Sequence, residues 1–312
     1  MEPDELFGGV RVLIVAGKGG VGKTTVAATL ARAASAHGRR VLACDIEGKR
    51  GLATAFGVDR LEYAVGELIA PSASEGGVSG RTLPPDEALL EYLEAHGLRR
   101  LRSRLGRTGL LDLIATATPG IKDILVLGKI RQLAEAHEAD LIVVDAPAAG
   151  HAISFLRAPM TLVDMAKLGP LRSQSERALD LLQDGDRTRV VLVTLPEETP
   201  VTEVVETAFA LEDELGIHLG PVVVNGLEPE LTARPPTAEL AASAGLDLVP
   251  ATTAALDDMA STRHRRARAQ QAQVTRLSRE LPLPRVELPQ VYGAPSPRQL
   301  VEHLADAVTA AP

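Results

Sequence analysis

A glycine-rich stretch near the amino terminus has the residue types and spacing of a phosphate-binding loop: Gly17-Lys18-Gly19-Gly20-Val21-Gly22-Lys23-Thr24-Thr25. It fits the pattern Gly-x-x-x-x-Gly-Lys-Thr, in which successive backbone N–H groups and a helix N-terminus surround phosphate oxygens. In such a loop Lys23 would reach the β- and γ-phosphates and the Thr24 hydroxyl would ligate Mg2+. The pattern therefore predicts a nucleoside triphosphate bound with its metal ion.

The same glycines also satisfy a second phosphate-binding pattern. Gly17, Gly19 and Gly22 fit Gly-x-Gly-x-x-Gly, and acidic residues follow at Asp45 and Glu47, as in a dinucleotide-binding fold. A pyrophosphate-binding turn has no need for an adjacent Lys-Thr pair, whereas a triphosphate with its metal ion needs both. The sequence therefore favours a nucleoside triphosphate over a nicotinamide dinucleotide, and competition between the two ligands would discriminate these alternatives.

Strand and helix patterns flank the loop. The apolar run Val10–Ala16 predicts a strand and Val26–Ala34 predicts a helix, so the loop falls at a strand-to-helix turn. Further strands are predicted at Arg40–Asp45, Asp140–Asp145, Arg189–Thr194, Pro221–Asn225 and Arg285–Leu288, and a closing helix at Ser296–Ala310. Strands that alternate with helices predict an α/β fold, a mostly parallel, doubly wound sheet with helices on both faces.

One interval, residues 58–135, departs from this alternation. It opens with a Gly-, Ser- and Pro-rich stretch at Pro71–Pro85, and a helix with Asp86 and Glu87 in its first turn follows. We expect a single ATPase-type domain over residues 1–312, with 58–135 as a helical insertion within it. The apolar residues of the insertion either form its own core or line a groove for a client helix.

Composition excludes several classes of partner. The chain has 312 residues, a formal net charge of -8, 2% aromatic residues and no Trp, which disfavours binding to nucleic acid. Cys44 is the only cysteine, so we expect no disulfide framework and no zinc site of the Cys-x-x-Cys type. No apolar run approaches the roughly 20 residues of a spanning helix, and the acidic start is wrong for a signal peptide. We expect a cytoplasmic protein whose membrane role, if it has one, is peripheral.

A basic run near the carboxyl terminus, residues 263–268, lies inside a helical pattern that ends near Glu280. Because the chain as a whole is acidic, a solvated helix face explains this run better than a nucleic-acid contact.

A second acidic position ends an apolar run. Asp145 follows residues 141–144, which places its carboxylate at the carboxyl edge of a parallel strand, where α/β proteins bind ligands. An acid in that position holds Mg2+ directly or through a water molecule.

The loop resembles the deviant phosphate loop of a group of ATPases. This group includes chromosome-partition, septum-site, nitrogenase iron-protein and arsenite-pump or tail-anchored-protein-targeting ATPases. Residues 18–25 carry the resemblance through Lys18, an additional lysine inside the loop. In that group this lysine contacts the nucleotide of the partner subunit, so the resemblance implies a nucleotide-dependent dimer.

The stretch after Asp145 narrows the resemblance to one branch. Asp145-Ala146-Pro147-Ala148-Ala149-Gly150-His151 is similar to the Asp-Thr-Ala-Pro-Thr-Gly-His switch of the arsenite-pump and tail-anchor-targeting branch, with the proline displaced by one position. The resemblance implies that Gly150 and His151 are switch residues. It also implies that Asn225 hydrogen-bonds adenine and that Glu197 contacts nucleotide across the dimer.

The other switch resembles that of paired ATPases found in actinobacteria. Residues 45–51, Asp-Ile-Glu-Gly-Lys-Arg-Gly, match the Glu-x-Glu-Gly-Arg-x-Gly type, and this alignment places Glu47 where the family has its water-orienting aspartate. Glutamate is longer by one methylene, so we expect slow hydrolysis. Asp45 is implied to take a second role at Mg2+. A homodimer and a heterodimer with a paralogue both fit this resemblance.

The resulting expectation is an ATP-hydrolysing dimeric switch that passes its closure to a client protein or a membrane protein. Glu47, Lys18 and Lys23 would carry the chemistry, and Thr24, Asp45 and Asp145 the metal. Two alternatives stay open: a catalytically weak nucleotide-binding subunit that scaffolds an active paralogue, and a partition or septum-site type of ATPase.

Overall fold

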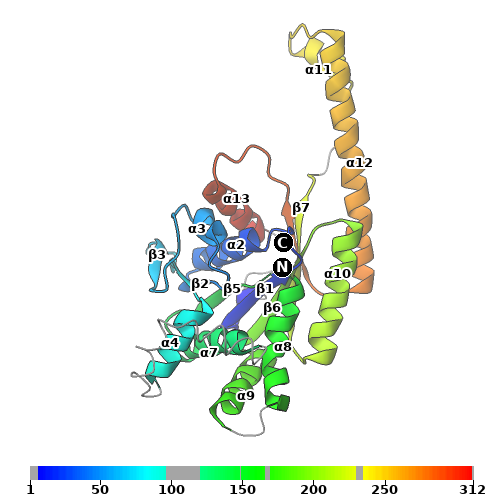
Figure 1. Cartoon of the computed structure of the whole chain (residues 1–312). Coiled ribbons are helices and arrows are strands. Elements are labelled where there is room, and N and C mark those ends of the chain that lie inside the picture. Colours follow the sequence, from blue (N-terminus) through cyan, green and yellow to red (C-terminus); the bar gives the residue numbers. More distant parts are fainter. Residues whose placement is uncertain (1–5, 96–119, 148, 166–168, 230–234, 311–312) are drawn as a thin grey trace.

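The computed structural model describes residues 6–95, 120–147, 149–165, 169–229 and 235–310. Its centre is an eight-stranded sheet of order β3-β4-β2-β5-β1-β6-β7-β8, parallel except for β3, which pairs antiparallel with β4 (Figure 1). The strands are β1 (Val12–Gly17), β2 (Val41–Asp45), β3 (Gly66–Ile69), β4 (Val78–Thr82), β5 (Leu141–Asp145), β6 (Thr188–Thr194), β7 (Leu219–Leu227) and β8 (Arg285–Pro289). The predicted α/β fold is confirmed.

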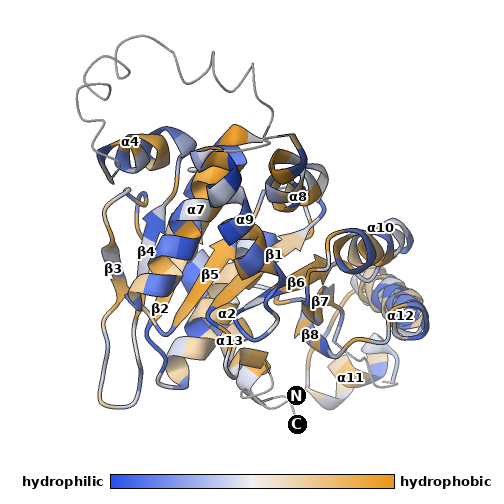
Figure 2. Ribbon diagram, turned by 90° about the horizontal axis from the view of Figure 1, so that it is seen from below, coloured by the Kyte–Doolittle hydropathy of each residue, from blue (hydrophilic) through white to orange (hydrophobic). Residues whose placement is uncertain are grey.

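The alternation of side chains along β1 explains why helices cover both faces of the sheet. Val12, Ile14 and Ala16 belong to one buried cluster, and Leu13 and Val15 belong to the other, so every side chain along most of the strand is apolar. The second cluster includes residues of α2 (Lys23–Ala36), α3 (Arg50–Ala55) and α13 (Pro297–Ala310). The opposite face is covered by α7 (Ile121–Ala136), α8 (Ala149–Met165), α9 (Pro170–Gln183) and α10 (Glu198–Phe209) (Figure 2).

The interval 58–135 differs from the predicted helical insertion. It contains α4 (Pro85–Ala95) and all but the last residue of α7, but β3 and β4 come first and extend the central sheet. The prediction of a helical insertion is therefore wrong for residues 66–69 and 78–82, which form strands. Strand β4 was not predicted because Gly80 and Arg81 do not fit an apolar strand pattern. In the structure, the buried Arg81 lies over the ring of Tyr63, 4.5 Å from the ring centroid, and Gly80 leaves room for Leu68. Residues 96–119, on which the expected client groove partly falls, lie outside the described residues.

A long helix, α12 (Pro250–Glu280), leaves the body of the molecule with α11 (Thr237–Ser243) packed at its outer end (Figure 1). Its inner half packs against α10 and β7. The predicted basic run lies in the middle of this helix, and the helix ends at Glu280 as expected. Among the helices of the described ranges, none combines the length and apolarity that crossing a bilayer requires.

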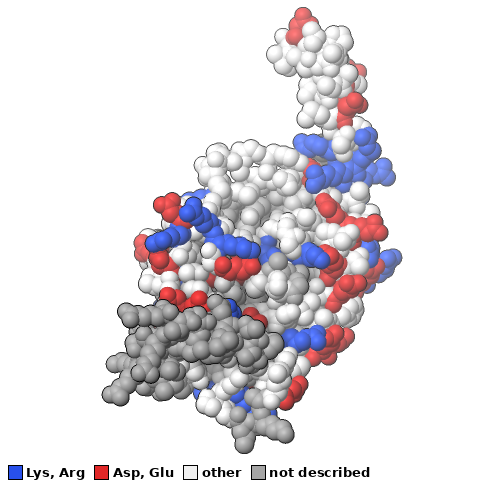
Figure 3. Space-filling view, in the orientation of Figure 1, with Lys and Arg blue, Asp and Glu red and all other residues white. Residues whose placement is uncertain are grey.

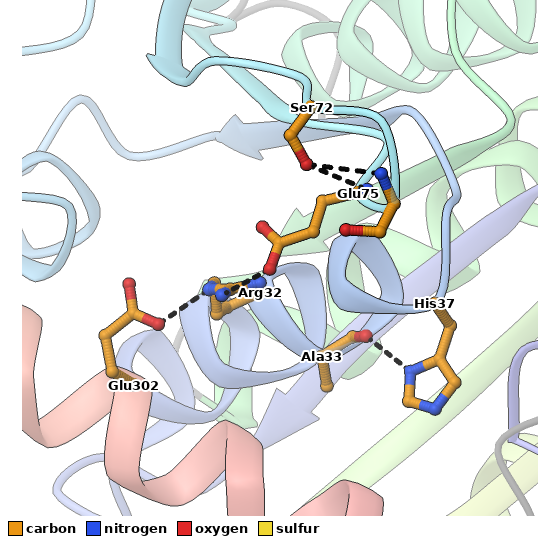
Figure 4. A network of polar contacts seen from close by, with 7 residues as sticks. Arg32, Ala33, His37, Ser72, Glu75 and Glu302 are labelled. Carbon is orange, nitrogen blue, oxygen red and sulfur yellow. Dashed lines mark hydrogen bonds and ion pairs between the residues drawn. The ribbon is translucent and has the colours of Figure 1, made fainter.

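One ion-pair network ties the helix that follows the loop to its neighbours (Figure 4). Arg32 of α2 donates to Glu302 of α13 over 2.6 Å and to Glu75, in the turn before β4, over 3.1 Å. The Arg32 side chain is only 16% exposed. Because both carboxylates pair with one largely buried guanidinium, the network holds α2, the helix that follows the loop, in place against α13 and the turn before β4.

Replacement of Arg32 by Met should lower the free energy of unfolding by about 1–2 kcal/mol, because two charge-assisted hydrogen bonds are lost and two carboxylates are left unpaired. Urea unfolding measures this change. The matched control is Arg60→Met, which removes the Arg60–Glu62 pair with side chains 75% and 60% exposed. This control should cost less than about 0.5 kcal/mol, and an equal loss in both variants would contradict the structural role given to Arg32.

Candidate functional site

The predicted phosphate loop joins the carboxyl end of β1, at Gly17, to the first residue of α2, Lys23. Two glycines are required by its shape. Gly22 has φ of 90°, and a Cβ there would lie 2.3 Å from Nδ2 of Asn225. A Cβ at Gly17 would lie 2.4 Å from the carbonyl oxygen of Val193 on β6. Close contacts from β6 and β7 therefore leave no room for a side chain at these two positions of the loop.

The N-terminus of α2 opens toward the space that the loop encloses. Within the described structure, its first turn has no acidic residue and its cap makes no side-chain hydrogen bond, so its N–H groups remain suited to an anion. Nζ of Lys23 donates to the carbonyl of Lys18 over 3.0 Å and closes the loop on itself. Burial lowers the pKa of Lys23, although the carboxylates of Asp145 and Glu47 oppose that shift. A phosphate would give this desolvated ammonium a better partner.

Two carboxylates meet beside the loop because of the strand order. Asp45 ends β2 and Asp145 ends β5, and the two residues are direct neighbours in the register of these adjacent parallel strands. Oδ2 of Asp145 accepts a hydrogen bond from the Thr24 hydroxyl over 2.7 Å. Oδ1 of Asp45 accepts from the backbone N–H groups of Glu47 and Gly48 over 2.9 and 3.2 Å. Both acids are more than nine-tenths buried.

The remaining oxygen of each carboxylate has no hydrogen-bond partner in the described structure. These atoms are Oδ2 of Asp45 and Oδ1 of Asp145, and both are buried. Burial raises the pKa of Asp145 to about 6, against the opposing hydrogen bond from Thr24, and burial also raises the pKa of Asp45. Two desolvated carboxylates side by side are costly unless a cation compensates them.

The donor set fits Mg2+, which prefers carboxylate and hydroxyl oxygens. Among the described residues, no three side chains of His, Cys, Asp or Glu converge as a metal site on their own. A metal ion held by Thr24, Asp45 and Asp145 would therefore complete its coordination with phosphate oxygens and water, as Mg2+ does at nucleotide sites. In this geometry, binding of Mg2+ and binding of a nucleotide would be coupled.

The remaining predicted residues of the first switch and the loop lie at the rim of the site. Glu47 is in the exposed loop after β2, and its Oε2 lies 2.8 Å from Nζ of Lys49. Lys18 is 54% exposed and pairs with Glu203 of α10 over 2.5 Å. Thr25 follows Thr24 in the first turn of α2. Both Lys18 and Glu47 are thus held by partners within the chain and can be released at little cost, because exposed ion pairs contribute at most about 1 kcal/mol.

Asn225 lies directly under the loop. Its Nδ2 donates to the carbonyl of Val21 over 2.9 Å and its amide contacts Gly22. The resemblance implied a contact with adenine, whereas this structure gives Asn225 the additional task of bracing the phosphate loop.

The other predicted positions are less closely tied to the loop. Gly150 and His151 lie in the first turn of α8, and the exposed His151 counteracts the burial that raises the pKa of Asp123 on α7. Glu197 is exposed at the N-cap of α10. Within the described residues, no hydrogen bond or ion pair joins the side chain of Glu197 to the loop.

Sequence reasoning missed two residues that shape the site, Glu203 and Lys49. Glu203 lies 185 positions from Lys18 in the chain, and no local pattern distinguishes it from other surface acids. Lys49 stands two residues after Glu47, so its proximity was visible, but its pairing with that carboxylate depends on the conformation of the loop.

A strand, a glycine loop and a helix that begins with Lys-Thr, beside two in-register acids at a carboxyl sheet edge, define a P-loop nucleoside triphosphatase. A model of the anion-transporting ATPase family matches residues 10–175. The chain is 35% identical over 305 residues to ATPase BagA of Mycobacterium tuberculosis, covering 91% of this chain and 88% of that protein. The chain therefore belongs to the anion-transporting ATPase family, as the resemblance predicted.

More distant relatives carry different names. The chain is 27% identical over 246 residues to the arsenical pump-driving ATPase of Acidiphilium multivorum, covering 71% of this chain and 40% of that protein. It is 25% identical over 266 residues to ATPase GET3C of Arabidopsis thaliana, covering 70% of this chain and 67% of that protein.

Two glycines of the loop provide a matched test of its geometry. Gly22→Ala should weaken ATP binding at least about tenfold, because a Cβ there collides with Asn225 and strains the left-handed backbone. A Cβ at Gly19 meets nothing within 4 Å, so Gly19→Ala should keep the melting temperature of the wild type. Calorimetric titration measures the ATP affinity, and thermal unfolding measures the melting temperature. Unchanged ATP affinity in Gly22→Ala would contradict this description of the loop.

The two ends of β5 test the metal site. Asp145→Asn should weaken ATP binding by about 10–100-fold when Mg2+ is present and change it little in EDTA, because the amide binds a cation poorly. Asp140→Asn is the control, since Asp140 pairs with Arg40 at the other end of the strand. Equal effects of Asp145→Asn with and without Mg2+ would rule out a metal role for this carboxylate.

Proposed function

We propose that the chain is a magnesium-dependent ATPase that works as a nucleotide-driven dimeric switch. The observation that carries the proposal is the pair of buried oxygens of Asp45 and Asp145 beside Thr24, for which the described residues provide no hydrogen-bond partner. This arrangement supports a site for a metal ion that binds together with a nucleoside triphosphate. We propose that residues 1–312 form one ATPase domain.

The proposed residues divide the work of hydrolysis. Residues 17–25 hold the phosphate groups through backbone N–H groups, and Lys23 places its charge on the β- and γ-phosphates. Glu47 orients a water molecule, whose oxygen attacks the γ-phosphorus while the bond to the β–γ bridging oxygen breaks. The products are ADP, phosphate and a proton. Magnesium, when bound, neutralises charge on the phosphate oxygens.

Two ion pairs must open before this site is complete. Glu47 must leave Lys49 to face water, and Lys18 must leave Glu203 to reach the nucleotide of a second subunit. Closure of two subunits would supply the new partners. Glu197 and Asn225 are proposed to contact the nucleoside, and Gly150 and His151 to respond to the γ-phosphate.

The partners of the switch are proposed from the relatives. Two of them are named an arsenical pump-driving ATPase and a GET3 ATPase, which supports coupling of closure to a membrane protein or a client protein. We propose a cytoplasmic protein that acts as a homodimer or as a heterodimer with a paralogue, peripheral to the membrane where it meets such a partner. Its acidic charge supports neither nucleic acid nor anionic lipid as a partner.

A catalytically weak subunit is the second candidate. The observation that favours it is Glu47 itself, a longer acid than the family aspartate and one already paired with Lys49. Such a subunit would bind ATP, scaffold an active paralogue and turn over little ATP alone.

Steady-state hydrolysis of Mg-ATP by the purified chain decides between these candidates. The wild type should hydrolyse ATP faster than Lys23→Ala, which lacks the phosphate-binding charge. Glu47→Gln should lower turnover at least about a hundredfold while ATP still binds. Turnover that is unchanged in Glu47→Gln would remove this residue from the mechanism. ATP binding without turnover in the wild type would instead favour the scaffolding subunit.

Lys18 tests the role proposed across the dimer. Lys18→Ala should bind Mg-ATP like the wild type but fail to dimerise with it, whereas Glu203→Gln should dimerise at least as well, because it releases Lys18. Sedimentation velocity with and without Mg-ATP measures dimer formation in both variants. ATP-dependent dimers of Lys18→Ala would contradict the contact in trans.

A further inference from the structure

The outer end of α12 is an arm that carries exposed apolar side chains. We define the arm as residues 235–262, which comprise α11 and the first part of α12 (Figure 1). From Pro250 to Thr262, at about 1.5 Å per residue, the helix extends about 20 Å. The large exposed apolar residues of the arm are Leu240, Leu246, Val249, Leu256 and Met259, with exposed fractions of 38%, 59%, 64%, 39% and 63%.

The arm projects from the same edge of the sheet that holds the phosphate loop. Gln270 of α12 donates to the carbonyl of Gly226, at the end of β7, and accepts from the N–H of Glu228. Asn225, one residue before Gly226, braces the phosphate loop. The helix therefore passes the carboxyl edge near residues 263–270, and the arm lies beyond it.

The apolar stripe of the arm continues the stripe that packs α12 onto the body. Leu256, Met259, Arg263, Gln270, Val274 and Leu277 follow one another at spacings of three, four or seven residues, so they share one face of the helix. The last three are buried in the body. Leu256 and Met259 present the same face above the sheet edge, where they are 39% and 63% exposed. A second body of the same kind, placed against this edge, would cover them.

Charge changes sign along α12 at the point where it passes the edge. Residues 235–262 contain four acids and no Lys or Arg, and Glu239, Asp247 and Asp258 are exposed. A basic collar follows at once, which we define as Arg263, Arg265, Arg266 and Arg268. Figure 3 shows this band of positive charge between the arm and the body. Within the described residues, the carboxylate paired with Arg263 and Arg266 is that of one residue, the buried Glu228, so the collar keeps a positive excess.

We propose that the arm docks on a second copy of this chain, with the acidic, apolar arm of each copy lying against the basic collar of the other. A two-fold axis near the charge boundary would bring both pairs of surfaces together at once, because an isologous contact uses the same patches on both subunits. This inference rests on the proposed closure of two copies at the nucleotide edge. The exposed acids of the arm disfavour the alternative of insertion into an anionic lipid surface.

Charge reversal with rescue tests the contact by sedimentation equilibrium with Mg-ATP at low salt. Arg265→Glu with Arg268→Glu should weaken self-association at least about tenfold, and so should Asp247→Lys with Asp258→Lys. The four changes combined in one chain should restore the affinity to within about threefold of the wild type, because the two surfaces again carry opposite charges. The restored association distinguishes a docking contact from damage to the fold.

The apolar part of the proposed contact is tested by Met259→Asp, with Val65→Asp as the control. Val65 is 48% exposed beside β3, at the opposite edge of the sheet from β8. Only Met259→Asp should weaken self-association. Mg-ATP hydrolysis is followed in the same samples. Dimers that no arm or collar variant weakens would overturn the inference and leave the ATPase standing.

A wild type that stays monomeric while it hydrolyses ATP would overturn both the docking and the closure. Pelleting with phosphatidylglycerol vesicles that Met259→Asp abolishes, without any effect on dimers, would also overturn the inference, in favour of a membrane contact.

Discussion

The buried pair of carboxylates at Asp45 and Asp145 is the constraint on which the site depends. One oxygen of Asp145 accepts a hydrogen bond from Thr24, and one oxygen of Asp45 accepts from the backbone N–H groups of Glu47 and Gly48. The other oxygen of each carboxylate has no partner among the described residues. Desolvation makes two charged carboxylates side by side unfavourable, so a bound cation would offset a cost that the fold imposes. A divalent ion with so few protein ligands would complete its coordination with phosphate oxygens, and these are the groups that the glycine loop is suited to hold.

The strand order of the sheet places these two acids side by side. Strand β5 lies between β1 and β2, so the loop after β1 and the acid that ends β2 both border Asp145. Arg32 ties α2 to α13 and to the turn before β4, and Asn225 braces the loop from β7. The arm on α12 rises from the same edge as this site. The proposed nucleotide site and the proposed subunit contact therefore lie at the same edge of the sheet.

Much of this was predictable from local patterns. Apolar runs with acids at their ends predicted β2 and β5 correctly, and the strand and helix on either side of the glycine loop were also predicted correctly. The neighbouring positions of Asp45 and Asp145 were not predictable, because strand order is decided by packing across the whole sheet. Strand β4 escaped prediction because Gly80 and Arg81 interrupt its apolar pattern. The pairing of Lys18 with Glu203 joins distant parts of the chain, and no sequence period marks it.

The most direct measurement of the central claim is electron paramagnetic resonance of Mn2+, used in place of Mg2+, with the purified chain. We predict about one tightly bound ion per chain when ATP is present, with coupling to the phosphorus nuclei of the nucleotide, and little binding without ATP. Equal binding of Mn2+ with and without ATP, or a bound ion without phosphorus coupling, would contradict the account.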